Sequence, residues 1–126
     1  MTTVAAVLVC VLLTALAALQ TTLILGAPLG RFAWGGQHEV LPRPLRVGSA
    51  ASVVVYGLLA VVVVARADLL SEGSSGGLVR AGAWIVAAYF FVGIGLNLAS
   101  RSRPERHVMT PVAAVLCVLC VIVAAS

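Results

Sequence analysis

Residues 4–25 read VAAVLVCVLLTALAALQTTLIL, a run of twenty-two residues without one charged side chain. A helix needs about 20 apolar residues to cross the hydrocarbon core of a bilayer, so this run is long enough to span it. Lipid offers the backbone no hydrogen-bond partner, so the run must be helical there, despite valines that favour strands in water. The run also lacks the basic n-region and short apolar core of a signal peptide, so we expect a retained transmembrane helix.

Three further apolar runs follow, at residues 49–65, 78–99 and 108–125. The whole chain is 62% hydrophobic and only 10% charged, whereas a soluble domain is typically about 25% charged. A chain of 126 residues with this composition has too little polar surface to be a soluble globular protein. We therefore predict one all-α membrane domain over residues 1–126, an antiparallel bundle of four transmembrane helices with structured first and third loops.

The arginines set the expected orientation. All eight basic residues are arginines, and six of them fall in the first loop (residues 26–48) and the third loop (residues 100–107). These six are Arg31, Arg43, Arg46, Arg101, Arg103 and Arg106. Cytoplasmic loops of membrane proteins carry an excess of basic residues. We therefore expect a multi-pass protein of the inner (plasma) membrane with both of these loops in the cytoplasm and both termini outside.

The first loop is too long for a plain helix–helix connection, which usually takes about 2–8 residues. We expect it to fold back along the membrane surface, with Trp34 at the level of the headgroups. Pro42 and Pro44 favour an extended chain before the second helix. Ser49 is the predicted N-cap of that helix.

The two arginine-rich loops predict a binding site. Gln20 and Asn97 lie near the cytoplasmic ends of their helices, where they would form the floor of a polar pocket. Arginine forks and helix N-termini both favour an anionic group. The expected ligand-binding residues are Gln20, Arg31, Arg46, Asn97, Arg101, Arg103 and Arg106. Glu105 lies inside the arginine run, where it can pair with Arg101 or Arg103.

An acid–base site is a second interpretation of the same loops. His38, Glu39, Glu105 and His107 are the candidate catalytic groups, although no spacing among them matches a metal motif. We expect no metal and no cofactor. Tyr56 and Tyr89 fall near mid-membrane, where either can hydrogen-bond across helices. Cysteines within apolar helices usually fill space, and this is the expected role of all three in this chain.

Three stretches resemble a group of small, uncharacterised four-helix bacterial membrane proteins. They are GAPLGRFAWGG (residues 26–36), LPRPLRVGS (residues 41–49) and NLASRSRPERHVMTPVA (residues 97–113). The resemblance implies a four-helix topology and no known activity.

Three functions remain open from the sequence. The first is a membrane binding or transport module that recognises an anionic or lipid-like molecule at the cytoplasmic cap. The second is an accessory subunit of a larger membrane complex, and the third is an enzyme acting on a lipid-like substrate. The expected partners are membrane lipids, a possible anionic small molecule and a second copy of the chain, most simply in a dimer. The net charge of +4 comes from the loops and is no argument for nucleic-acid binding.

Overall fold

The structure is a computed structural model, which describes residues 2–67 and 77–125. Within these ranges it contains four long helices and no strand. The helices are α1 (Thr2–Ile24), α2 (Arg43–Arg66), α3 (Gly77–Leu98) and α4 (Thr110–Ala125). A π-helical turn, η3 (Glu105–Met109), leads directly into α4. With η3 counted as part of α4, each helix is long and apolar enough to cross a membrane. The chain is therefore an all-α, multi-pass membrane protein, as the apolar runs predict.

The second helix begins earlier than the sequence suggests. Its first residue is Arg43, and the extended residue before it is Pro42. Pro44 lies in the first turn, where its missing N–H costs no intrahelical hydrogen bond. The prediction of Ser49 as N-cap is wrong, because Ser49 lies inside α2 with its side chain fully buried. The extra turns shorten the first loop to residues 25–42.

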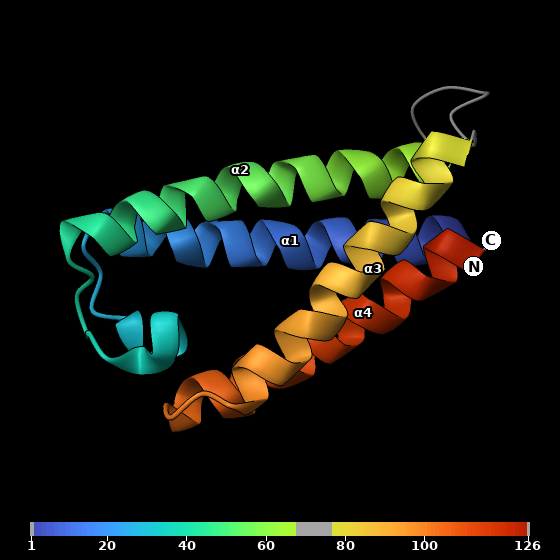
Figure 1. Cartoon of the computed structure of the whole chain (residues 1–126). Coiled ribbons are helices and arrows are strands. Elements are labelled where there is room, and N and C mark those ends of the chain that lie inside the picture. Colours follow the sequence, from blue (N-terminus) through green and yellow to red (C-terminus); the bar gives the residue numbers. More distant parts are fainter. Residues whose placement is uncertain (1, 68–76, 126) are drawn as a thin grey trace.

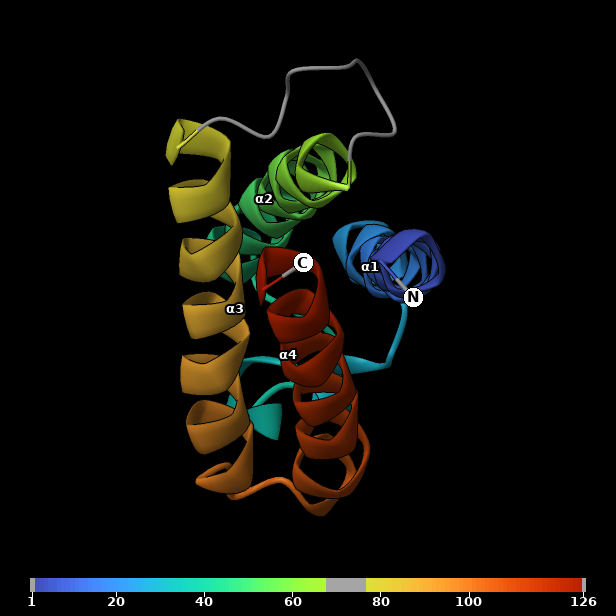
Figure 2. The ribbon, with the colours of Figure 1, turned by 90° about the vertical axis from the view of Figure 1, so that its right-hand side faces the viewer.

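The four helices form two antiparallel hairpins, α1–α2 and α3–α4, which cross at an angle (Figure 1). Both termini lie at the end where the hairpins converge, and the hairpins separate toward the other end (Figures 1 and 2). The main core fills the convergent end. Its buried members include the small residues Ala5, Ala6 and Ala87, which let the helix backbones approach closely. The separated end therefore has space that helices alone do not fill.

Arg66 joins the hairpins at the convergent end. Its guanidinium is buried, and Nη2 donates a hydrogen bond to the carbonyl oxygen of Ala124 at 3.3 Å. A positive charge is favourable at the C-terminal end of a helix, where the last carbonyl groups lack partners. Arg66 thus acts as a link between the end of α2 and the end of α4.

The first loop occupies the separated end (Figure 1). It folds into two short 3₁₀ turns, η1 (Gly30–Phe32) and η2 (Trp34–Gly36), and η1 contacts η3. A small second core of Leu23, Ala33 and Leu41 holds the loop against the end of α1. The loop is therefore a structured element that reaches from one hairpin to the other.

Candidate functional site

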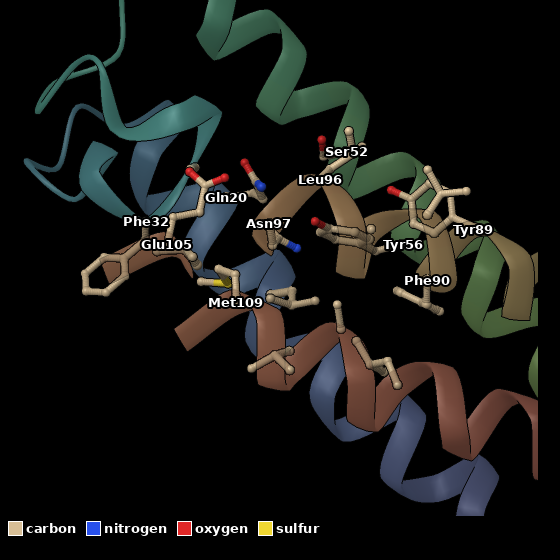
Figure 3. A pocket seen from close by; sticks show the side chains of 18 of the residues that line it. Gln20, Phe32, Ser52, Tyr56, Tyr89, Phe90, Leu96, Asn97, Glu105 and Met109 are labelled. Carbon is tan, nitrogen blue, oxygen red and sulfur yellow. The ribbon is translucent and has the colours of Figure 1, made fainter. Parts of the chain in front are cut away.

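A cavity of about 690 Å³ lies between the two hairpins, beneath the first loop (Figure 3). This volume is typical of a small-molecule pocket. All four helices, the first loop and η3 contribute to its wall. The wall is mostly aliphatic and aromatic, and its polar members are Gln20, Ser52, Tyr56, Tyr89, Asn97 and Glu105, with the indole of Trp34. The cavity thus offers a large apolar surface and a few polar groups.

Most of these polar groups gather at the end of the cavity nearest the loop. In the view of Figure 3, the ends of Gln20, Asn97 and Tyr56 and the Glu105 carboxylate all lie in this part of the cavity. The side chain of Gln20 lies near that of Tyr56. The Oε1 atom of Gln20 is buried and has no hydrogen-bond partner among the described residues. A buried acceptor without a donor is costly, so this end of the cavity favours a ligand that donates hydrogen bonds.

Glu105 comes from the π-helical turn that begins the fourth span. Its side chain is only 8% exposed, and its Oε2 atom accepts a hydrogen bond from the Gly35 N–H at 2.9 Å. Pro111 explains the turn, because proline gives no N–H to the carbonyl of His107 and its ring crowds that carbonyl. A widened π turn accommodates this clash and sets the direction in which Glu105 points.

The first loop is attached to both hairpins above the cavity. The indole Nε1 of Trp34 donates to Ser49 Oγ on α2 at 3.1 Å. On the other side, Ser102 donates from its hydroxyl to the carbonyl oxygen of Arg31. Trp34 has a φ of 53°, which side-chain-bearing residues rarely adopt, and Gly35 follows with a φ of 75°. This tight turn presents the Trp34 ring to α2 and the Gly35 N–H to Glu105.

The far end of the cavity is aromatic and aliphatic. Tyr89 and Phe90 meet edge to face, with their ring centroids 5.2 Å apart. Leu16 and Leu116 face the same space from α1 and α4. An elongated molecule with one polar end and one apolar end would match this division.

Of the residues that the sequence predicts to bind a ligand, two line the cavity, whereas the five arginines do not. Gln20 and Asn97 form part of the wall, and their role in binding a ligand stays a prediction. Arg31 lies over the ring of Phe32, with its Cζ 4.9 Å from the ring centroid. Arg46 donates from Nε to the carbonyl oxygen of Leu41 at 2.8 Å, which holds the loop against α2.

The arginines of the third loop also lie outside the cavity. Arg101 and Arg103 are exposed. Arg106 donates from Nη1 to the carbonyl oxygen of Ser100 at 3.2 Å, which closes the turn between α3 and η3. In the described part of the chain neither exposed arginine pairs with Glu105. The Glu105 carboxylate accepts a hydrogen bond from the Gly35 N–H instead. An anion site at these arginines stays a prediction, separate from the cavity.

The candidate acid–base groups are dispersed. Glu105 lines the cavity, whereas His38, Glu39 and His107 are exposed at the surface of the loops. No group of three or more metal-ligating side chains occurs among the described residues. The three cysteines are free thiols, and Cys117 Sγ lies 3.6 Å from the carbonyl oxygen of Ala87 on the neighbouring helix.

Sequence reasoning missed several wall residues, among them Trp34, Ser52, Tyr56 and Tyr89. The two tyrosines stand out as polar side chains in otherwise apolar runs, and that signal marks a partner-facing position. Nothing in the sequence indicates that the ring of Trp34 lies against α2, because its direction depends on the positive φ of the loop.

Comparison of the chain with family models, with curated proteins and with solved structures gives no match. The resemblance to small four-helix bacterial membrane proteins therefore stays an expectation, and the function has to be argued from the cavity itself.

Proposed function

We propose that this protein is a small membrane-embedded binding module, possessing a single site for an amphipathic, lipid-like molecule between its two hairpins. The cavity of about 690 Å³, apolar along most of its length and polar at one end, carries this proposal. A lipid-like molecule would place its tail against Tyr89, Phe90 and Leu116, and its polar end near Gln20 and Asn97.

The surrounding structure supports this proposal. Residues of one chain line the whole of the described cavity wall, so we propose a site that does not require a second copy of the chain. The small residues of the main core close the opposite end of the bundle, and the first loop covers the end with the polar groups. Movement of a bound molecule between the bilayer and this loop would make the module part of a transport step.

The proposal includes an orientation. The first and third loops lie at the same end of the bundle (Figure 1), and they carry most of the arginines. We propose that this end faces the cytoplasm in the plasma membrane, with both termini outside. The polar end of the cavity would then lie near the inner leaflet.

Filling the cavity tests the proposal. Ser52 faces the cavity from α2, and its neighbour Ala51 is exposed and lies outside the cavity wall. We expect Ser52→Phe to reduce the binding of dodecanol about tenfold or more, because the added ring occupies the space of the tail. Ala51→Phe adds the same ring outside the cavity and should leave binding within about twofold of the parent protein.

Binding is measured by equilibrium dialysis of dodecanol against phosphatidylcholine nanodiscs, as the excess retained by protein-containing discs over empty discs. Equal retention by both kinds of disc, for dodecanol and for charged amphiphiles of the same chain length alike, would overturn the proposed function. Equal losses in the two variants would also contradict it, since the effect would then not come from the cavity.

A further inference from the structure

The charge of Glu105 is the feature of the cavity that the proposed function leaves unexplained. Among the described residues of the wall, Glu105 is the only one of the acidic and basic residue types (Asp, Glu, Lys, Arg and His). Its carboxylate is buried, and the hydrogen-bond donor that it contacts, the Gly35 N–H, is neutral. Neutral donors stabilise a carboxylate only in part, because its net charge remains in a low-dielectric site.

The nearest arginines along the chain and in the loop are engaged elsewhere. Arg106, which follows Glu105, donates to the carbonyl oxygen of Ser100. Arg31 lies over Phe32 on the loop. In the part of the chain that the structure describes, no arginine forms an ion pair with Glu105. The polar end of the cavity is therefore acidic, although the protein as a whole is basic.

Other groups at this end of the cavity also favour the binding of a cation. The unpartnered Oε1 of Gln20 is a second acceptor at this end of the cavity, and an ammonium group has N–H donors for both. Trp34 and Tyr56 are aromatic members of the same wall. Aromatic faces attract cations through the ring quadrupole, most strongly where water is excluded.

We infer that the ligand of this cavity is a lipophilic amine, with its ammonium group at Glu105 and Gln20 and its apolar part toward Tyr89 and Phe90. This inference rests on the proposed function and adds the charge of the head group to it. It differs from the anionic ligand that the loop arginines predict, because those arginines lie outside the cavity.

Three probes with the same alkyl chain test the inference: dodecylammonium, dodecanol and dodecyl phosphate. Each is dialysed against protein-containing and empty phosphatidylcholine nanodiscs, and the retention by empty discs is subtracted. We expect the parent protein to bind dodecylammonium about tenfold or more tightly than dodecanol, and dodecyl phosphate more weakly than either.

Glu105→Gln removes the charge and keeps the size of the side chain. It should lower the affinity for dodecylammonium about tenfold and change the affinity for dodecanol less than about threefold. Glu39→Gln is the matched control, because Glu39 is an exposed carboxylate in the first loop. This control makes the same change in net charge and should leave the preference for the amine intact.

The outcomes separate the two proposals. If no probe is retained by the protein, the proposed function fails. If dodecanol or dodecyl phosphate binds as tightly as dodecylammonium, or if Glu105→Gln keeps the full preference for the amine, the inferred amine is wrong while the binding module stands. Should Glu105→Gln not fold, the ranking of the three probes on the parent protein decides the inference alone.

Discussion

Trp34 and Gly48 show how one contact fixes the first loop on the bundle. Gly48 lies in α2, where an added Cβ would be only 2.8 Å from two ring carbons of Trp34. The absence of a side chain at Gly48 lets the indole lie flat enough to donate to Ser49. A side chain at position 48 is incompatible with this arrangement, so the loop depends on a glycine that belongs to a different element.

Gly48→Ala should displace the Trp34 ring and lower the free energy of unfolding by about 1–3 kcal/mol, the usual cost of overpacking. Gly57→Ala on the same helix is the control, because a Cβ there meets no atom within 4 Å. We expect Gly57→Ala to be neutral or to stabilise by up to about 1 kcal/mol, since alanine is the better helix former. Denaturant titration in detergent, followed by tryptophan fluorescence, compares the two variants. Equal destabilisation by both would contradict the importance of the Trp34 contact.

Single residues also mark the limit of what the sequence predicts about the site. Gln20 and Asn97 could be placed in a pocket because polar amides in apolar helices usually face a partner. The contact of Trp34 with α2 could not be predicted, because it follows from a positive φ that no residue type demands. Glu105 was predicted to pair with an arginine. In the structure its carboxylate accepts a hydrogen bond from the Gly35 N–H instead, and only the folded loop brings that group near.

At the scale of elements, the π-helical turn at the start of α4 connects helix geometry to the cavity. The four spans were predictable, because each apolar run must satisfy its backbone hydrogen bonds within itself. The extension of the fourth helix back to Glu105 was not, since the apolar run that predicts this helix begins only at residue 108. The structure retains the helix before Pro111 by widening the turn, which gives Glu105 a direction that regular α-helical spacing would not give.

Pro111→Ala should let this turn relax to α-helical geometry. Loss of the one-residue bulge would rotate Glu105 by about 100° around the helix axis and remove its contact with Gly35. We expect the amides around Gly35 to exchange hydrogen about tenfold faster or more, consistent with the loss of one hydrogen bond to a charged group. Hydrogen exchange read by mass spectrometry on the peptide containing residues 30–40 measures this change.

Pro44→Ala provides the control for that experiment. Pro44 lies in the first turn of α2, where proline removes no intrahelical hydrogen bond, so its replacement should leave exchange in the loop unchanged. Unchanged exchange in Pro111→Ala itself would show that the proline does not set the direction of Glu105.

At the scale of the whole molecule, the bundle has one packed end and one open end. The packed end holds the main core, the buried Arg66 and both termini. The open end holds the first loop, the third loop, the polar groups of the cavity and most of the arginines. Because the two loops contact each other through η1 and η3, they have to lie on the same side of any membrane that the helices cross.

This arrangement makes the topology a sharp prediction. In a background with the three native cysteines replaced by alanine, Gln37→Cys tests the first loop and Ala99→Cys the third, both at exposed positions. Thr3→Cys, also exposed, reports the other end. In intact cells a membrane-impermeant maleimide should label Thr3→Cys alone, and after permeabilisation it should label all three, as the arginine excess in the loops predicts.

Labelling of both loops and not of Thr3→Cys would reverse the orientation and leave the fold intact. Different accessibility of Gln37→Cys and Ala99→Cys would instead contradict the fold, because the cavity exists only if both loops close the same end of the bundle.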